Sequence, residues 1–512
     1  MMKYISTRGG DIPVSGAAAI IRGLASDRGL YVPAELPRLD AGAAFGAESG
    51  GAAGGIAADA TERPVFGAGY RAVARAVLGA FLPDYSEEEI RVCVDGAYDE
   101  KFDTPEIAPL VKTDKAYFLE LWHGGTAAFK DMALSILPYL LKTAMRKEGE
   151  DKKVVILTAT SGDTGKAALA GFADVPGTEI FVFYPKDGVS AVQERQMVTQ
   201  TGANVHVYGI RGNFDDAQKG VKNVFNDAVF GEALAGRGLR LSSANSINIG
   251  RLVPQVAYYV YAYGKLLSDG EIQNGEAVNI CVPTGNFGNI LAAYYAKQIG
   301  VPIARLLCAS NENKVLTDFL DTGVYDARRE FILTSSPSMD ILISSNLERL
   351  LWHLSGGDSE QIAYLMAGLE RDGHYETGAG IKAGLRDFQG GFADMKKAHQ
   401  SLARLCREEH YLIDTHTAVG YSVYLDDLAK TGDRTKTIIV STASPYKFAG
   451  SVAASLGLPG EADEFAYMER IRAYTGAPIP AGLRGLEKKP ALHTGVIDKD
   501  AIQSTVDFAL RD

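Results

Sequence analysis

The sequence contains only four cysteines, and no motif pairs them. Cys93, Cys281, Cys308 and Cys406 lie far apart in a chain of 512 residues, without a C-x-x-C spacing. This argues against a disulfide framework and against a cysteine-based zinc site. The eight histidines include neither H-x₃-H nor H-E-x-x-H, so nothing supports a metal-dependent hydrolase. We therefore expect no metal site.

Clustered positive charge and long apolar runs are also missing. The chain has 52 Lys and Arg against 63 Asp and Glu, a net charge of −11, so we expect no nucleic-acid-binding surface. No eighteen apolar residues follow one another, which argues against a membrane-spanning helix. The start MMKYISTRGGD lacks the apolar region of a signal peptide. These absences predict a cytoplasmic enzyme. We expect a small-molecule substrate and either a monomer or a homodimer, although the sequence does not fix the oligomeric state.

The length predicts two or three packed units rather than one. We expect an N-terminal α/β domain over residues 1–108, with a flexible insertion at 41–60, where 15 of the 20 residues are Gly or Ala. A large domain is expected over 109–145 and 241–512, and a smaller one over 146–240.

Short apolar strands alternate with helical patterns through the rest of the chain. This alternation is typical of βαβ units, so the expected fold class is α/β, with mainly parallel sheets and helices on both faces. The predicted strands are 153–160, 179–184, 204–207, 277–282 and 437–441.

Three of these strands end in turns rich in glycine and hydroxyl residues. The turns are Ala159–Lys166 (ATSGDTGK), Pro283–Asn289 (PTGNFGN) and Ser441–Phe448 (STASPYKF). In open α/β sheets, ligands bind at the carboxyl ends of the strands, and N–H groups at the start of a helix attract anions. The first turn lacks the G-x₄-G-K-[ST] spacing of a nucleotide-binding loop. Taken alone, each turn is also compatible with a purely structural role.

Lys130 stands at the start of an apolar helix, next to Phe129. Most lysines lie on the surface with their charge in water. Apolar surroundings destabilise the ammonium form, as Schiff-base chemistry requires. Together with two turns suited to anions and Thr442 at a strand end, Lys130 suggests pyridoxal phosphate and a second, anionic ligand.

A series of motifs, in order from the first residues to Lys447, resembles the threonine synthases of the longer type. These belong to the fold type II, tryptophan-synthase-β-like pyridoxal-phosphate enzymes. The resemblance implies two open, mainly parallel sheet domains on either side of a cofactor cleft, plus an N-terminal domain. The motifs are Tyr4–Gly9, Gly29–Pro33, His123–Thr126 with Phe129–Asp131, Thr160–Gly165, Asn245–Asn248 with Arg251, Thr284–Asn289, and Thr442 with Pro445 and Lys447.

The resemblance also implies a role for each motif. Lys130 would carry the cofactor as a Schiff base, and Thr442 would hydrogen-bond its pyridine nitrogen. The cofactor phosphate would be bound by Gly285, Asn286, Phe287, Gly288 and Asn289. The substrate carboxylate and the ring edge would contact Thr160, Ser161, Asp163 and Thr164. The substrate phosphate would contact Asn245, Ser246, Asn248 and Arg251.

The implied reaction converts O-phospho-L-homoserine and water into L-threonine and phosphate, the last step of threonine biosynthesis. A phospho-lyase that releases 2-oxobutyrate and ammonia would need the same residues, so the sequence does not separate the two. A pyridoxal-phosphate-binding protein without turnover is a third reading, which the presence of Lys130 and Arg251 disfavours.

Three positions depart from the family pattern, and they are either neutral or alter specificity. Gly125 stands where proline is usual, Lys166 replaces a small residue and is expected to face solvent, and Ser444–Tyr446 replaces His-Pro-Ala. We expect His416 to be structural and His123 to contact the substrate at most marginally.

Overall fold

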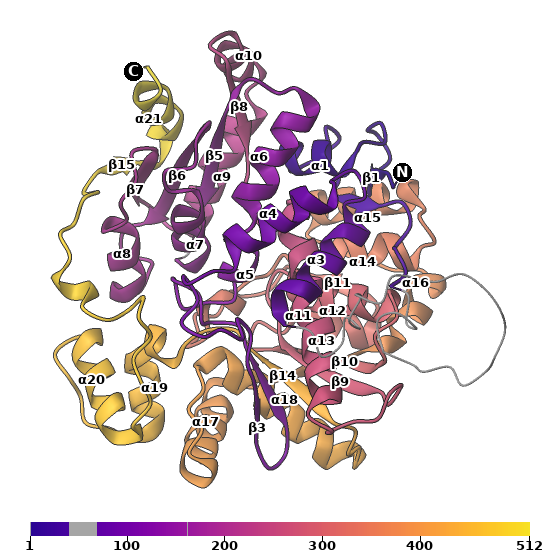
Figure 1. The fold of residues 1–512 in the computed structure, drawn as a ribbon, viewed down its shortest axis with the longest axis vertical. Helices are drawn as coiled ribbons and strands as arrows, with labels where there is room; N and C mark the ends of the chain where they lie inside the picture. Colours follow the sequence, from indigo (N-terminus) through magenta and orange to yellow (C-terminus); the bar gives the residue numbers. More distant parts are fainter. Residues whose placement is uncertain (1, 40–68, 161, 512) are drawn as a thin grey trace.

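Two mainly parallel sheets with helices on their faces dominate the fold (Figure 1). The computed structural model describes residues 2–39, 69–160 and 162–511. The Gly/Ala-rich insertion expected at 41–60 and the predicted site residue Ser161 lie outside the described residues. Within the described part of the chain, no helix is both long and apolar enough to cross a bilayer.

The larger sheet has six strands and buries both faces. All neighbouring strands pair in parallel except β3 and β4, which are antiparallel. Along β14, Ile438 and Val440 join one hydrophobic core and Ile439 joins another, because successive side chains of a strand point to opposite faces. In spatial order the strands are β13 (Phe388–Phe392), β10 (Ile303–Ser310), β9 (Val278–Pro283), β14 (Thr437–Ser441), β4 (Tyr117–Glu120) and β3 (Leu110–Lys112).

The smaller sheet has five strands, and all of its pairings are parallel. Its spatial order is β15 (Val496–Asp498), β7 (Val205–Arg211), β6 (Thr178–Pro185), β5 (Lys153–Ala159) and β8 (Leu239–Ser242). Its helices are α7 (Asp163–Phe172), α8 (Ala191–Val198), α9 (Phe214–Asn226), α10 (Ala228–Gly236) and α21 (Ile502–Ala509).

The C-terminal segment departs from the expected division of the chain. The prediction assigned all of 241–512 to the large domain, but β15 pairs with β7, and α21 packs on α9 of the smaller sheet. The chain therefore crosses back from the larger sheet to the smaller one at its end, as the yellow ribbon in Figure 1 shows. A three-residue strand carries no periodic signal from which this could be predicted.

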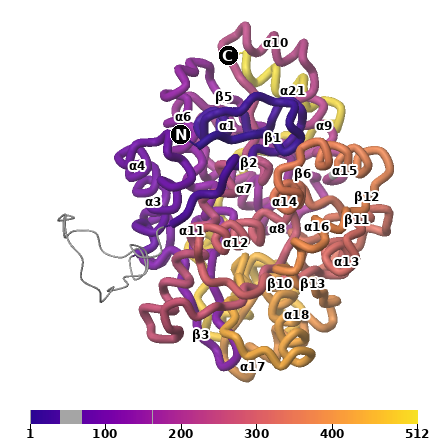
Figure 2. Tube along the Cα trace, turned by 90° about the vertical axis from the view of Figure 1, so that its right-hand side faces the viewer, coloured from indigo at the N-terminus to yellow at the C-terminus, as the bar shows by residue number. Residues whose placement is uncertain are grey.

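The N-terminal region packs directly on the helices of the larger unit. It contains the antiparallel strands β1 (Tyr4–Ser6) and β2 (Tyr31–Pro33) with α1 (Gly16–Arg22), α3 (Tyr70–Phe81) and α4 (Glu87–Ala97). Helix α3 packs on α11 (Ile249–Ser268), and α1 packs on α6 (Leu137–Glu148), an arrangement that Figure 2 shows from the side. One continuous hydrophobic core includes residues of all these helices.

Helix α11 is the central helix of the molecule. It is buried around most of its circumference, as expected for a helix that is apolar on all sides. The remaining elements are α5 (Asp131–Leu134), α12 (Gly288–Gln298), α13 (Val315–Thr322), β11 (Val324–Asp326), α14 (Leu347–Leu354), α15 (Ser359–Asp372), β12 (His374–Glu376), α16 (Ala379–Gly384), α17 (Met395–Glu409), α18 (Thr415–Thr431), α19 (Ala449–Leu456) and α20 (Glu464–Thr475), with short 3₁₀ turns at Pro337–Met339 and Pro445–Phe448 among others.

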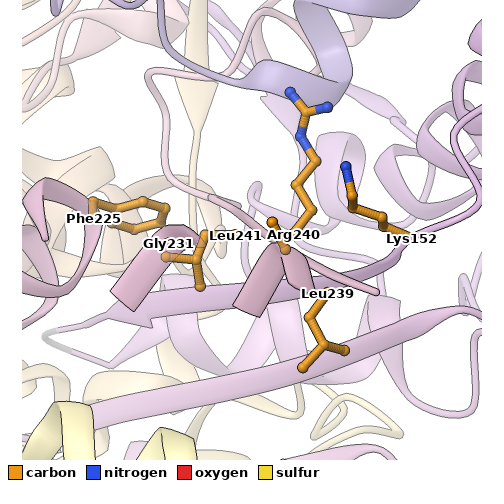
Figure 3. A pocket seen from close by; sticks show the side chains of 7 residues that line it. Lys152, Phe225, Gly231, Leu239, Arg240 and Leu241 are labelled. Carbon is orange, nitrogen blue, oxygen red and sulfur yellow. The ribbon is translucent and has the colours of Figure 1, made fainter. Parts of the chain in front are cut away.

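A surface hollow of about 340 Å³ lies at the edge strand β8. Figure 3 shows Arg240 and Lys152 on one side of it and Phe225 on the other. The Arg240 guanidinium donates to Glu150 at 2.7 Å, so its charge is already compensated. None of the predicted site residues lines this hollow.

His123 joins the segment before β3 to the larger sheet. Its Nδ1 lies 2.6 Å from Asp103 Oδ1, and its Nε2 lies 2.8 Å from Glu120 Oε2. Burial lowers the pKa of His123, but the two carboxylates outweigh burial and raise the pKa to about 9. At neutral pH the ring is therefore an imidazolium between two carboxylates. Its expected substrate contact stays a prediction, and both of its nitrogens are occupied by structural partners.

The His123 bridge predicts a defined pH dependence of stability. A raised folded pKa stabilises the protein fully below the unfolded pKa of about 6.5, and this stabilisation is lost as the pH rises through about 9. We expect wild type to lose about 2–3 kcal/mol of unfolding free energy between pH 6.5 and 10 relative to His123→Gln. Urea unfolding of both proteins across this range checks it. Parallel pH curves for the two proteins would contradict the bridge.

Candidate active site

The turn that carries Lys130 is attached to the end of strand β14. Phe129 N donates to Thr442 O at 2.8 Å, and Ala128 and Ala443 form an isolated antiparallel bridge. Lys130 itself is the N-cap of α5. Two of the four regions singled out in the sequence, the lysine turn and the Ser441–Phe448 turn, therefore meet at the carboxyl edge of the larger sheet.

The Lys130 amine lies in a nearly enclosed position, with 12% of the side chain exposed. Its Nζ donates to Ser338 Oγ at 3.2 Å and lies 3.5 Å from Asp163 Oδ2. Burial lowers the pKa of Lys130; Asp163 opposes this, while the charges of Lys447 and Arg251 lower the pKa further. The net effect is a depressed pKa, which favours the neutral amine that Schiff-base formation needs.

Asp163, at the start of α7 of the smaller sheet, lies between Lys447 and Lys130. Its Oδ1 accepts from Lys447 Nζ at 2.7 Å and from Gln193 Nε2 at 2.9 Å, and its Oδ2 faces Lys130. Burial raises the pKa of Asp163, but Lys447 and Lys130 outweigh it and hold the pKa well below its usual range. Asp163 is thus a buried carboxylate whose oxygens are already held by cations and an amide.

The turn after β5 is shaped by Thr160. Its Oγ1 accepts from the backbone N–H groups of Gly162 and Gly165, both at 2.9 Å. These two N–H groups are therefore occupied within the turn instead of being open to an anion. Gly162 has φ 134°, and a Cβ there would lie 2.4 Å from the Gln193 side chain, so the turn requires glycine at this position. Thr164 follows in the first turn of α7 and is partly exposed.

The turn after β9 leads into α12 through strained backbone. Phe287 is a non-glycine residue at φ 63°, a conformation that is costly for a bulky side chain and is often found at functional sites. Asn286 is exposed, and its carbonyl accepts from the N–H and the Nδ2 of Asn346, both at 3.1 Å. A Cβ on Gly285 would lie 2.5 Å from Ser338 O. This turn is therefore tightly held by the segments around Ser338 and Asn346.

Asn289 offers an unused donor at the start of α12, close behind Gly288. Its Oδ1 accepts from Tyr258 and Tyr259 at 2.5 and 2.6 Å. Its Nδ2 is buried without a hydrogen-bond partner among the described residues. An orphaned buried donor indicates a group that the protein itself does not supply.

Arg251 is a buried guanidinium, and no carboxylate among the described residues pairs with it. It donates to Ala244 O at 3.0 Å, and its Nε has no partner in the described part of the chain. Burial lowers the pKa of Arg251 to about 10. Since an uncompensated buried charge is costly, Arg251 is well suited to receive an anion.

The other residues predicted to contact a substrate phosphate differ in exposure and in whether their side chains already make hydrogen bonds. Asn245 and Ser246 are partly exposed. Asn248 is 1% exposed: its Oδ1 caps α11 at Gly250, and its Nδ2 donates to Ile20 O at 3.0 Å. The Asn248 side chain thus joins α11 to α1 through these hydrogen bonds.

Thr442 and the turn that follows it have separate roles. Thr442 is 6% exposed, and its hydroxyl has no hydrogen-bond partner within residues 2–39, 69–160 and 162–511. Ser444 Oγ caps the short 3₁₀ turn, and the Tyr446 hydroxyl donates to Ala477 O at 2.5 Å. The unusual Ser444–Tyr446 sequence is therefore accommodated by structural contacts.

Lys166, expected to face solvent, is instead half-buried with a pKa lowered to about 8 by burial.

These residues fit pyridoxal phosphate. A buried lysine with a depressed pKa can form a Schiff base, and Thr442 at a strand end has a hydroxyl without a hydrogen-bond partner among the described residues. The turn after β9 starts a helix whose N-terminus favours a phosphate, next to the orphaned Asn289 Nδ2. Arg251 remains available for a second anion.

Comparisons with known proteins agree with this fit. A family model described as "Pyridoxal-phosphate dependent enzyme" matches residues 102–383. Models described as "Threonine synthase N terminus" and "Threonine synthase, C-terminal" match residues 3–47 and 417–506. A threonine synthase of Schizosaccharomyces pombe is 34% identical, over 93% of this chain and 96% of its own length. This chain belongs to the threonine synthase family.

Two further relatives refine the assignment. A solved structure of pyridoxal-phosphate-bound threonine synthase from Brucella melitensis is 34% identical, with a TM-score of 0.85 and 100% of both chains covered. Threonine synthase-like 1 of Homo sapiens is 38% identical over 86% of this chain, which spans 57% of that protein. The predicted α/β, fold type II architecture and the pyridoxal phosphate cofactor are confirmed.

Sequence reasoning missed several residues that hold the site together. Lys447 was noted only as part of a motif, yet it is fully buried and pairs with Asp163. Arg349, also fully buried, donates to Tyr31 O at 3.0 Å and to Ile247 O. Ser338 lies in a loop that does not directly follow a predicted strand. The sequence pattern of such a loop looks like that of an ordinary connection, so nothing in it indicated a functional role.

The Lys130→Ala variant is expected to fold but to lack the visible absorption band of lysine-bound cofactor. The half-buried Lys166 provides a matched control, since its Nζ is directed to Gln200, and Lys166→Ala should keep the band. Absorption spectra of the purified proteins with added pyridoxal phosphate make the comparison. An unchanged band in Lys130→Ala would mean that another lysine holds the cofactor.

Proposed function

We propose that this protein is a threonine synthase, converting O-phospho-L-homoserine and water into L-threonine and phosphate. The observation that carries the proposal is the buried guanidinium of Arg251, whose Nε has no partner among the described residues and whose charge acts on the Lys130 amine. A cofactor-binding lysine and a separate anion site fit a substrate with an amine at one end and a phosphate at the other. Family membership provides the second line of support.

Pyridoxal phosphate, when bound, supplies an electron-withdrawing ring that stabilises negative charge next to the substrate nitrogen. The freed Lys130 amine removes the proton at Cα and one proton at Cβ, and phosphate leaves from Cγ. Lys130 then returns a proton to Cγ. Water adds its hydroxyl to Cβ, and a proton returns to Cα, which gives threonine. The depressed pKa of Lys130 lets one amine serve as both base and acid.

We assign the leaving phosphate to Arg251, Asn245 and Ser246. Arg251 presents a planar fork that matches phosphoryl oxygens, while Asn245 and Ser246 lie in the partly exposed loop just before α11. Asn248 contributes by holding that loop, because its own side chain is bonded to α1 and to the start of α11. The same anion site retains phosphate until water has been added.

We assign the substrate carboxylate to the turn after β5, with Thr160, Ser161 and Thr164. Asp163 would repel an incoming carboxylate, so its role in this proposal is to anchor the turn through Lys447 and to attract the Lys130 ammonium. The cofactor phosphate is assigned to Gly285–Asn289, where Asn289 Nδ2 lacks a partner among the described residues, and the pyridine nitrogen is assigned to the hydroxyl of Thr442.

We further propose that the cofactor lies between the two sheets, where the turns after β5, β9 and β14 face one another. In this reading the larger unit comprises 109–145 and most of 241–512, and the smaller comprises 146–240 with the C-terminal strand and helix. We place the reaction in the cytoplasm and expect a monomer or a homodimer.

Product analysis tests the proposed function. The holoenzyme is given O-phospho-L-homoserine, and released phosphate and the carbon product are both quantified. Phosphate with equimolar threonine is the expected result. Phosphate with 2-oxobutyrate and ammonia would overturn the proposal in favour of a lyase, and no phosphate release by a protein with bound cofactor would mean that the substrate is different.

Arg251→Met should raise the KM for O-phospho-L-homoserine by about 30-fold or more, because hydrogen bonds to a charged group contribute about 2 kcal/mol. Cofactor content should remain that of wild type. Arg251→Lys keeps the charge but not the planar fork of donors, so its KM should lie between those of wild type and Arg251→Met. Steady-state kinetics together with cofactor absorbance give both quantities, and a parallel loss of cofactor in Arg251→Met would contradict its assignment to the substrate.

A further inference from the structure

The segment between β11 and α14 brings Ser338 into the site. Ser338 Oγ accepts from Lys130 Nζ at 3.2 Å. Its carbonyl oxygen lies 2.5 Å from the position that a Cβ on Gly285 would take. One residue therefore contacts both the lysine that carries the cofactor and the turn assigned to the cofactor phosphate.

Ser338 is held from behind by a buried histidine. Its backbone N–H donates to His416 Nε2 at 3.1 Å, and His416 Nδ1 lies 2.6 Å from Asp414 Oδ2. Since Nε2 accepts, the ring proton is assigned to Nδ1 and donated to Asp414. Asp414 is 0% exposed and also caps α18 through the N–H groups of His416 and Thr417, so the ring has a fixed orientation.

We propose that Ser338 is a further catalytic residue that receives the Lys130 amine each time it leaves the cofactor, and that His416 and Asp414 are positioning residues that hold Ser338 there. This rests on the proposed function only in using Lys130 as the proton carrier. A hydroxyl both accepts and donates, so it can bind the ammonium and the neutral amine in turn. Asp163, at 3.5 Å, attracts the charged form alone.

This arrangement stabilises the released lysine relative to the lysine bound to the cofactor. Losing Ser338 should therefore make any amine displace Lys130 less readily, whatever the natural substrate is. It should also lower kcat, because the free amine is no longer held where it exchanges protons. The substrate amine displaces Lys130 in the same way, so the KM for the substrate should rise as well.

The first experiment measures release of Lys130 in the holoenzyme with glycine, which has an amine and a carboxylate but no phosphate. For Ser338→Ala, the glycine concentration giving half of the absorbance change should rise about 10-fold or more, with normal cofactor content. Ser338→Thr, which keeps the hydroxyl, should stay close to wild type. Ser335→Ala is the matched control, since Ser335 Oγ pairs with His399 at 2.9 Å and does not contact Lys130.

The second experiment tests His416 through coupling. His416→Phe removes the acceptor for the Ser338 N–H and should raise the half-saturating glycine concentration as Ser338→Ala does. In the double variant the effects should not multiply, because both changes remove the same contact. His416→Phe that lowers thermal stability without altering the glycine titration would make His416 merely structural and overturn its positioning role.

The outcomes separate this inference from the proposed function. A glycine titration that is the same for wild type, Ser338→Ala and Ser335→Ala would overturn it even if threonine is the product. An equal shift in Ser338→Ala and Ser335→Ala would attribute the effect to the segment and not to the hydroxyl, which also overturns it. A shift confined to Ser338→Ala supports it even if a different phosphorylated amino acid is the substrate.

Discussion

The buried ion pair between Asp163 and Lys447 is the interaction on which the rest of the site depends. Asp163 begins the helix after β5 of the smaller sheet, while Lys447 lies in the turn after β14 of the larger one. Their 2.7 Å contact therefore joins the two sheets at the point where the Lys130 amine lies. A pair with both partners nearly inaccessible to water is costly to break, because either group left alone is an uncompensated buried charge.

The electrostatic balance of the site follows from this pair. Lys447 also donates to Thr126 O at 3.0 Å and so holds the turn that leads to Lys130. With Asp163 engaged by Lys447, its attraction for Lys130 does not cancel the effect of burial, and the pKa of Lys130 stays depressed. Arg251 is a second buried cation and, unlike Lys447, has no carboxylate partner among the described residues. The result is a site in which the buried cations Lys447 and Arg251 lie near the Lys130 amine.

Much of this could be predicted from the sequence, because βα turns leave strong local signals. Apolar strands followed by glycine and hydroxyl residues indicated the turns after β5, β9 and β14, and the apolar flank of Lys130 indicated its burial. Pairings between distant residues leave no local signal in the sequence. Asp163 and Lys447 are 284 positions apart, and each alone resembles an ordinary surface charge. Asn248 was predicted to contact the substrate phosphate because it lies in a motif, but its capping geometry is visible only with α1 in place. Lys166 follows the same pattern, since its burial comes from neighbouring segments and not from its own helix.

A double-mutant cycle between Asp163→Asn and Lys447→Met tests the central interaction most directly. Urea unfolding of the holoenzymes gives the free energy of each variant. Each single change should cost about 3–5 kcal/mol because it removes the closest ionic partner of a buried charge, and the double variant should be markedly less destabilised than the sum. Additive losses, or single losses below about 1 kcal/mol, would contradict the view that this pair joins the two sheets around Lys130.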